Sequence, residues 1–365
     1  MHFEVDFLPV GDGERSADAI ALRFGDFNGP RCNQHVIVID GGTKESGQRL
    51  VTHINTYYGT NAVDSVLLTH SDSDHASGLT VVLEQMQVSR LLMHKPWDHS
   101  EEILDDIEDG RVTSDSVEDR FRKSMQQAHD LALLAEKKGI PVFEPFTDLK
   151  GLLGNMYILG PSREYYENLL PQFRPIEEPK KEASFSAAFG AVAEMLGKVA
   201  EYFNVETLKD PEENETSAEN NSSVILLIVD GAYAWLFTGD AGVPALTLAT
   251  NYATDLGIDL RRVRNLQIPH HGSRHNVGPT LLNRLIGPIL AQAAFTKSAC
   301  VSASKGDKKH PSKKVTNAYY RRGVSVYSTQ DTAGYLRYYS LGTPDRPECV
   351  PAKPIPFYNE VEEDE

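Results

Sequence analysis

Four side chains that can bind a metal ion stand within six residues of one another: His70, Asp72, Asp74 and His75. They come directly after the apolar run 64–69, which has the length and composition of a buried strand. A loop at the end of a strand can turn neighbouring imidazoles and carboxylates toward one point, and these groups are the donors that a divalent cation needs. The spacing therefore predicts a metal centre at this loop, in preference to a polar turn with capping aspartates.

Two further groups of ligand-type residues also follow predicted strands. Asp240 comes straight after an apolar run and Gly239, where a carboxylate can approach a metal closely and bridge two ions. His270 and His271 are adjacent in Pro-His-His-Gly-Ser, which indicates one ligand and one neighbour without telling which is which. Gly-Asp turns are common and adjacent histidines can simply pack, so each group gains weight only beside the first.

The segment 261–322 is strongly basic. It holds thirteen Lys or Arg and a single acid, Asp307, a local charge of +12 in a chain whose net charge is −16. Such asymmetry is typical either of a surface for anionic substrates or of an ordinary solvated face, and composition alone does not decide between them. The segment contains the adjacent histidines and a second polar group made of Ser302, Ser304, Lys305 and His310.

These residues suit a hydrolytic reaction. A bound divalent ion lowers the pKa of a water from 15.7 toward about 7, which makes hydroxide available for attack on phosphorus or a carbonyl carbon. We expect Asp74 to orient this nucleophile. We expect His310 and Lys305 to grip a phosphate or protonate the leaving oxygen, together with Ser302 or Ser304.

Short strands joined by turns are expected to position the ligand groups. In the first 70 residues the pattern predicts strands at 5–10, 19–24, 35–39 and 64–69 and a helix at 47–58. Further strands are predicted at 224–229 and 234–237, in hairpin spacing around Asp230-Gly231. Because the ligand groups follow strands, we expect them at the carboxyl ends of those strands, the usual place for chemistry in α/β folds.

Two helical insertions are expected outside this core, at about 100–139 and 161–219. In the first, apolar residues at helical spacing and the stop signal Gly139 predict one helix over 116–138. The second contains a predicted helix over 184–203 and an exposed linker over 210–220. We therefore expect a single domain over 1–345 that carries both insertions. A C-terminal tail, 346–365, follows it and is acidic at its end.

The order of these motifs, HxDxDH, then Gly-Asp, then His-His-Gly-Ser, resembles the metallo-β-lactamase superfamily. More specifically, it is similar to the hydrolase domain of ComEC-type competence proteins. The likeness extends along nearly the whole chain outside the insertions, through short motifs at 11–13, 17–20, 39–42, 220–223, 301–302 with 310–311, and 328–329 with 334. The resemblance implies a four-layer αββα sandwich of the α/β class, with metals along one sheet edge.

The resemblance also implies roles for the matched positions. His70 and Asp72 would belong to a first metal site. Asp74, His75 and one of the two adjacent histidines would belong to a second. Asp240 would bridge the two ions. The residues expected to line the substrate site are Asn221, Ser273, Ser302 and Ser304.

Two features depart from the common superfamily pattern. Asp72 stands where the superfamily usually has a histidine, and Asn221 and Ser223 stand where another histidine usually precedes the Gly-Asp strand. ComEC-like proteins share both features. They make the first site rich in oxygen, which favours Mn²⁺ or Mg²⁺ over a nitrogen-rich zinc site. We expect two divalent ions, Mn²⁺ or Zn²⁺, with the first one weakly held.

The expected function is that of a metal-dependent hydrolase, a phosphodiesterase or nuclease that acts on nucleic acid or nucleotides. One alternative is a small-molecule phosphoesterase of the cyclic-nucleotide or phosphorylcholine type. Another is a catalytically weak, metal-stabilised protein that binds a protein partner through its acidic helical insertions.

Three observations bear on the surroundings of the protein. No run approaches the roughly 18 apolar residues that span a bilayer, so no membrane role is expected. The three cysteines, Cys32, Cys300 and Cys349, are widely separated, which indicates a reducing, cytoplasmic compartment. His94 and His99 lie just beyond a predicted strand and are expected to be ordinary surface histidines.

Overall fold

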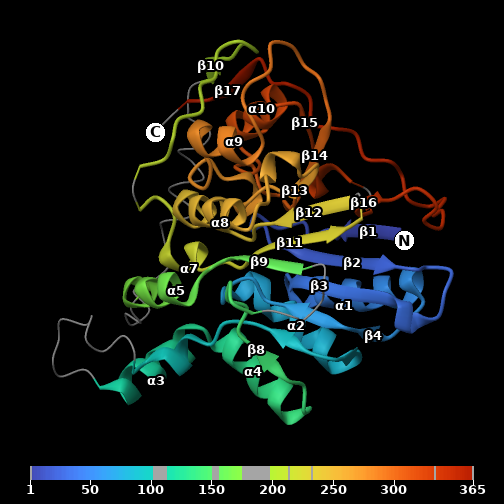
Figure 1. Ribbon diagram of the computed structural model, residues 1–365, viewed down its shortest axis with the longest axis vertical. Helices are drawn as coiled ribbons and strands as arrows, with labels where there is room; N and C mark the ends of the chain where they lie inside the picture. The colour runs from blue at the N-terminus through green and yellow to red at the C-terminus, as the bar shows by residue number, and fades with distance from the viewer. Residues whose placement is uncertain are drawn as a thin grey trace.

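Two β-sheets face each other at the centre of the molecule, and helices cover their outer faces (Figure 1). The computed structural model describes residues 2–101, 113–149, 156–174, 198–212, 214–231, 233–332 and 334–363. The seven-stranded sheet has the order β16 (Leu336–Tyr339), β1 (His2–Phe7), β2 (Ala19–Gly25), β3 (Gln34–Gly41), β5 (Ser65–Leu67), β7 (Leu91–Leu92) and β8 (Val142–Phe143). The six-stranded sheet has the order β15 (Val324–Ser328), β14 (Lys297–Val301), β13 (Asn265–Gln267), β12 (Tyr233–Phe237), β11 (Ile225–Asp230) and β9 (Met156–Gly160).

The central strands are apolar on both faces, because each sheet lies between a second sheet and a layer of helices. In β2, Ala21 faces the helices, whereas Ile20 and Leu22 point into the core between the sheets. In β11, Leu227 packs toward the helices and Leu226 toward the opposite sheet. This period of two is the geometry of any strand, and burial on both faces explains why the runs are continuously apolar.

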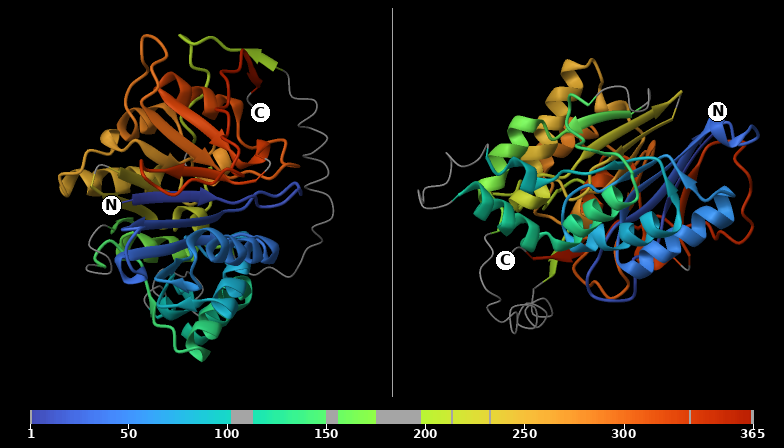
Figure 2. Two further views of the ribbon diagram at one scale, coloured as in Figure 1. Left: turned by 90° about the vertical axis from the view of Figure 1, so that its right-hand side faces the viewer. Right: turned by 90° about the horizontal axis from the view of Figure 1, so that it is seen from below.

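Helices close the two outer layers. The seven-stranded sheet is covered by α1 (Lys44–His53), α2 (Ser73–Gln85) and α4 (Gln126–Lys137), and the six-stranded sheet by α8 (Val243–Asp255), α9 (Pro279–Leu285) and α10 (Lys313–Arg321), as Figures 1 and 2 show. Burial of Leu79 and Leu131 on one side and of Leu246 and Tyr319 on the other anchors these layers. The predicted four-layer αββα sandwich is confirmed.

The first insertion does not form one helix over 116–138, so that prediction is wrong. Helix α3 (Ser114–Ser124) ends at Met125, whose φ of −112° and ψ of 40° are not helical, and α4 begins at the next residue. The two helices pack against different partners. Helix α3 lies against the short 3₁₀ turn η3 (Pro96–His99), whereas α4 lies against α2. Tertiary packing therefore breaks a continuous helical pattern.

The second insertion also differs from its predicted elements. The predicted helix 184–203 falls largely outside the described residues, but its last part is strand β10 (Lys198–Ala200), which pairs with β17 (Glu360–Glu362) near the C-terminus. The predicted exposed linker 210–220 is also wrong at its end. There Glu219, Asn220 and Asn221 of the short helix α7 (Ala218–Asn221) are buried.

The acidic C-terminal segment packs against the basic helix α10. The carboxylate of Glu362 accepts hydrogen bonds from the hydroxyl group of Ser312 and from the backbone N–H of Lys314, at the start of that helix. A carboxylate at a helix N-terminus is favoured by the helix dipole. Among the helices of the described residues, none is both long and apolar enough to cross a membrane.

Candidate metal centre

The predicted ligand groups meet at one edge of the sandwich. Strands β3 and β5 are parallel to each other, as are β12, β13 and β14, so the loops after these strands emerge at matching ends of the two sheets. Strand β2 is antiparallel to β3 and pairs Ala19 with Gly41, which places the residue before β2 at the same edge. The fold therefore brings together side chains that are far apart in the sequence.

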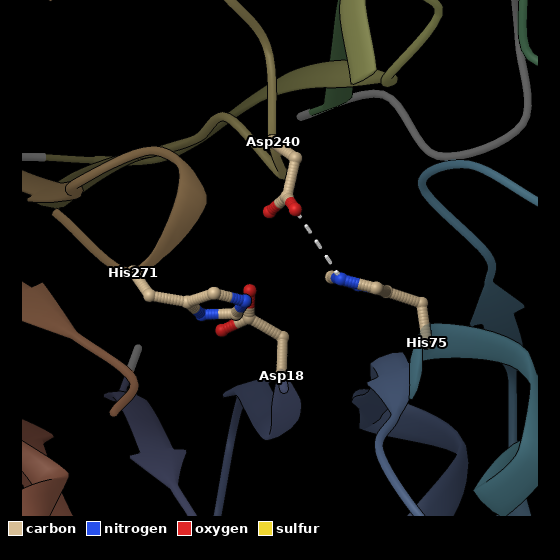
Figure 3. Close-up of side chains that lie close together, drawn as sticks. All are labelled: Asp18, His75, Asp240 and His271. Atoms are coloured by element: carbon tan, nitrogen blue, oxygen red, sulfur yellow. Dashed lines mark ion pairs between the residues drawn. The ribbon is translucent and has the colours of Figure 1, made fainter. Parts of the chain in front are cut away.

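Four buried side chains form the centre of this edge: Asp18, His75, Asp240 and His271 (Figure 3). One ligand-type atom from each residue lies within 4.8 Å of the corresponding atom of every other. They come from four separate segments and point toward one another. The distance from Nε2 of His75 to the carboxylate of Asp240 is 3.6 Å, which is too long for a hydrogen bond.

Several polar atoms of this centre have no hydrogen-bond partner in the described part of the chain, although they are buried. They are Oδ1 of Asp18, Nε2 of His70, Nε2 of His75 and Oδ1 of Asp240. Unpaired polar atoms in a protein interior are rare because each loses its hydration without compensation. Imidazole nitrogens and carboxylate oxygens that converge in this way are the donors of a divalent cation site, so these residues fit such an ion.

Asp40, at the end of β3, fixes the orientation of His75. Its carboxylate accepts hydrogen bonds from the backbone N–H of Thr69 at 2.8 Å, from the hydroxyl of Thr69 at 2.7 Å and from Nδ1 of His75 at 2.8 Å. With Nδ1 used as a donor, Nε2 is the atom left for a cation. Burial lowers the pKa of His75, but the charges of Asp40 and Asp240 more than offset it and hold that pKa well above its usual value.

His271 belongs to the buried cluster, whereas His270 lies at its rim. The Nδ1 atom of His271 donates to the backbone carbonyl of Ser302 at 3.0 Å, which again leaves Nε2 as the free ring nitrogen. Burial lowers the pKa of His271 to about 4, because the enclosed ring loses its hydration. His270 is partly exposed, and its Nε2 lies 3.7 Å from the carboxylate of Asp240. Both residues have positive φ, a strained conformation for non-glycine residues.

A second group shares Asp240 with the first. The Nε2 atom of His70 lies 3.9 Å from the carboxylate of Asp240 and 3.9 Å from that of Asp72. Burial raises the pKa of the Asp240 carboxyl, but His270 and His75 outweigh it and hold this pKa well below its usual value. Asp240 therefore stays ionised between the two groups, where a bridging ligand would be.

Asp74 is not one of the four residues of the buried cluster. It lies in the first turn of α2, half-buried, and its side chain makes no hydrogen bond or ion pair with any residue that the structure describes. The fourth member of the buried cluster is instead Asp18, which the sequence reasoning did not single out. A lone acid between two alanines at the start of a strand was the available signal. Burial raises the pKa of Asp18 to about 7, because the carboxyl is removed from water close to other acids.

His310 stands next to the cluster and is held by Asp307. Its Nδ1 atom lies 3.0 Å from the carboxylate of Asp307, and its ring centroid lies 6.0 Å from that of His270. The same carboxylate accepts hydrogen bonds from the hydroxyl of Ser16 and from the backbone N–H groups of Lys309 and His310. Asp307 was noted in the sequence only as the one acid of a basic segment. The structure gives it four donors.

Of the predicted substrate-lining residues, Ser302 has an unpaired hydroxyl, whereas the others make hydrogen bonds to the backbone. Ser302 is buried beside the cluster, and its hydroxyl has no partner among the described residues. The hydroxyl of Ser304 donates to the carbonyl of Gly13. The side-chain amide of Asn221 accepts from the backbone N–H of Gly242 and donates to the backbone carbonyl of Thr216. The hydroxyl of Ser273 accepts from the backbone N–H of His275. The exposed ammonium group of Lys305 lies 3.3 Å from Asp12.

His94 and His99 are not surface residues, so that prediction is wrong. His94 is buried between the rings of Phe146 and Tyr166, each with its centroid 4.5 Å away, and burial lowers its pKa to about 3. His99 is buried between two carboxylates, with Nε2 2.9 Å from Glu144 and Nδ1 3.1 Å from Glu167. The contacting residues at 144–146 and 166–167 pack over this loop and remove both rings from water.

The fold and the buried His/Asp cluster agree with the family that the sequence of the chain matches. Residues 33–285 match the family model of the metallo-β-lactamase superfamily, and the chain belongs to that superfamily. Members of the superfamily bind divalent metal ions, and the cluster described above fits this property.

A curated relative and two solved structures resemble the chain. The relative is ComE operon protein 3 of Bacillus subtilis (strain 168), 27% identical over 170 residues, which make up 45% of this chain and 20% of the relative. The match thus spans about a fifth of that protein. A crystal structure of the hydrolase AbOPH of the beta-lactamase superfamily gives 10% identity and a TM-score of 0.28 over 61% of this chain and 55% of that one. A mutant of CmlA beta-hydroxylase gives 13% identity and a TM-score of 0.38 over 92% and 53%. Both structural likenesses are too slight to support an argument.

Proposed function

We propose that this chain is a metal-dependent phosphodiesterase that hydrolyses a phosphodiester bond in nucleic acid or in a nucleotide. The observation that carries the proposal is the buried cluster of Asp18, His75, Asp240 and His271, with its unpaired donor atoms, beside the His310–Asp307 pair. The motif order that resembles ComEC-type hydrolase domains supports the choice of a phosphodiester.

Two cation positions are proposed at this edge. Asp18, His75 and His271 would hold one ion together with Asp240. His70 and Asp72 would hold the other, again with Asp240, which lies between the two groups. Ions bound there supply positive charge that polarises a phosphoryl oxygen and lowers the pKa of a water molecule. This assignment replaces Asp74 by Asp18, because Asp18 is the carboxylate that the fold turns into the cluster.

The residues of the chain have separate tasks in the proposed reaction. As a water oxygen attacks phosphorus and the bond to the leaving oxygen breaks, His310, held at Nδ1 by Asp307, donates the proton on Nε2 to that leaving oxygen. It regains a proton from water afterwards. The buried hydroxyl group of Ser302, beside Asp18, is the proposed donor to a phosphoryl oxygen. The rings of His270 and His310 lie side by side and both are partly exposed, so the substrate is proposed to approach the cluster from this side.

The basic segment 261–322 supports a confined substrate rather than a broad duplex-binding face. Arg321 is buried and pairs with Glu201 at 2.9 Å, and the buried Arg322 pairs with Glu206 at 2.6 Å. Arg261 pairs with an acid just before the segment. Charge that is already paired within the protein cannot replace the counterions of a phosphate backbone. A single strand or a nucleotide at the cluster edge needs less positive surface than a duplex does.

Hydrolysis assays on defined phosphodiesters test the proposal. With Mn²⁺, the wild-type protein should hydrolyse bis-p-nitrophenyl phosphate and at least one of single-stranded DNA, RNA or a cyclic nucleotide. His271→Gln should lose this turnover, whereas His129→Gln, on the outer helix α4, should retain it. Turnover confined to small diesters would favour the small-molecule phosphoesterase. No turnover of any diester, or equal turnover in His271→Gln, would contradict the proposal.

A further inference from the structure

An arginine that no motif predicted stands beside the candidate metal centre. The guanidinium group of Arg174 lies 3.4 Å from the carboxylate of Asp72, through Nη2, and this carboxylate lies 3.9 Å from Nε2 of His70 in the second ligand group. The side chain of Arg174 is 70% exposed. A fixed positive charge thus faces solvent at the rim of the cluster, in contact with one of the proposed ligands, Asp72.

A buried carboxylate orients this arginine. Glu219, in α7, is only 4% exposed, and one of its oxygens accepts hydrogen bonds from the backbone N–H of Arg174 at 2.7 Å and from Nε at 3.0 Å. The preceding residue, Phe173, is buried against Phe121 and Tyr166. Backbone and side chain are therefore both held, and the Nη1 end of the guanidinium makes no hydrogen bond with the described residues.

Stability does not account for this arrangement. An ion pair between exposed side chains such as Arg174 and Asp72 contributes little to folding, whereas burial of the Glu219 carboxylate is costly unless it is paired. The arrangement does provide a pre-oriented guanidinium, with free N–H groups in the planar fork that matches two phosphate oxygens. An exposed arginine without such an anchor would lose more side-chain entropy when it bound an anion.

We propose that Arg174 binds the phosphate group next to the scissile one, and that Glu219 is the positioning residue that aims it. The inference rests on the proposed phosphodiesterase function and narrows its substrate to a chain with at least two phosphates. A substrate with a single phosphodiester would leave the Nη1 end of Arg174 unused. We therefore expect Arg174 to affect KM for a strand with several phosphates, and not the chemical step.

The test compares two hexathymidylates that differ only in charge. One has ordinary phosphodiesters throughout, and the other keeps one central phosphodiester between uncharged methylphosphonates. In Arg174→Gln, KM for the fully charged strand should rise about tenfold, because a charge-assisted hydrogen bond is lost. Its kcat, and its kinetics on the flanked strand and on bis-p-nitrophenyl phosphate, should stay as in wild type. Glu219→Gln should raise KM for the charged strand in the same direction but by less.

Arg261→Gln is the matched control, since it removes an exposed, ion-paired arginine at the opposite end of β13. This variant should leave KM and kcat unchanged on both strands. If Arg174→Gln lowers kcat equally on every diester, the residue acts through Asp72 and the inference is overturned. Equal KM values for Arg174→Gln and wild type on the charged strand also overturn the inference. In that case, turnover of the strand by the wild-type protein still supports the phosphodiesterase function. Absence of wild-type turnover on all diesters overturns both.

Discussion

The carboxylate of Asp40 accepts a hydrogen bond from Nδ1 of His75 at 2.8 Å, and this contact decides which ring nitrogen faces Asp240. Asp40 also receives both hydrogen-bond donors of Thr69, the residue before His70. One buried side chain thus orients members of both ligand groups. Partners that orient ligands in this way are part of a metal site even though they do not touch the ion.

Asp40→Asn should weaken metal binding without removing a ligand. The amide keeps the shape of the carboxylate but loses its charge and cannot accept from all three donors, so metal affinity should fall about 10- to 100-fold. Titration with Mn²⁺ by calorimetry measures the change. Asp64→Asn is the control, because Asp64 pairs with Arg31 and the backbone of Val36 at the other end of the strands. Unchanged affinity in Asp40→Asn would show that the contact does not orient a ligand.

Asp18→Asn and Asp74→Asn should behave in opposite ways. Asp18 lies in the buried cluster, so its amide variant should bind about one metal ion fewer per chain and lose most turnover. Asp74 is half-buried at the start of α2, outside the cluster, and its variant should keep the wild-type metal content. Elemental analysis of both purified variants measures this. The reverse result would restore the assignment made from motif order.

The sequence singled out several members of the site because these residues are close together in the chain. His70, Asp72 and His75 lie within six residues of one another after an apolar run, and His270 and His271 are adjacent. Asp18 and Asp307 carry no such local pattern. Each enters the site only because antiparallel pairing or a loop contact brings it to the edge. Arg174 likewise depends on the buried Glu219, far along the chain.

The fold was predictable for a similar reason. Continuous apolar runs with turn residues between them predicted the main strands, and the motif order implied the layers. The break at Met125 was not predictable from helical spacing, because it follows from the separate packing of α3 and α4. The pairing of β10 with β17 was also missed, because it joins segments that are far apart in sequence and of little apolar character.

His310→Gln should slow reactions according to the leaving group. If His310 protonates the leaving oxygen, its loss should lower kcat about 100-fold or more for a nucleoside leaving group. It should matter much less for p-nitrophenolate, which leaves without a proton. Asp307→Asn should show the same selectivity to a smaller degree, because the ring keeps a weaker acceptor at Nδ1. An equal loss on both substrates would instead indicate a role in holding the site together.

The stability of the protein should depend on pH through His99. Burial lowers the pKa of His99, but its hydrogen bonds to Glu144 and Glu167 outweigh this and raise the pKa above its usual value. Burial raises the pKa of Glu144, but the hydrogen bond and charge of His99, together with the backbone N–H of Lys95, outweigh it and lower this pKa below its usual value. A raised histidine pKa contributes stability that is complete below about pH 6.5 and is lost as the pH rises through the folded value.

Urea unfolding of His99→Gln at two pH values checks this dependence. The substitution should cost about 1 kcal/mol more at pH 5.5 than at pH 8.5, because only the protonated ring donates to both carboxylates. Lys95 and Arg163 keep their contacts near Glu144 and Glu167 in the variant. His129→Gln, which alters a partly exposed ring on α4, should show no such difference. A cost that is equal at both pH values would contradict the assignment.

The central claim is that the buried cluster holds catalytic metal ions, and one paired measurement tests it most directly. Metal content by mass spectrometry and Mn²⁺-dependent hydrolysis of bis-p-nitrophenyl phosphate are measured on wild type and on Asp240→Asn, with Asp259→Asn as a surface control. We predict about two ions per wild-type chain, loss of both metal and turnover in Asp240→Asn, and wild-type behaviour in the control. A wild-type protein without bound metal or turnover, or an Asp240→Asn variant that keeps both, would contradict the account.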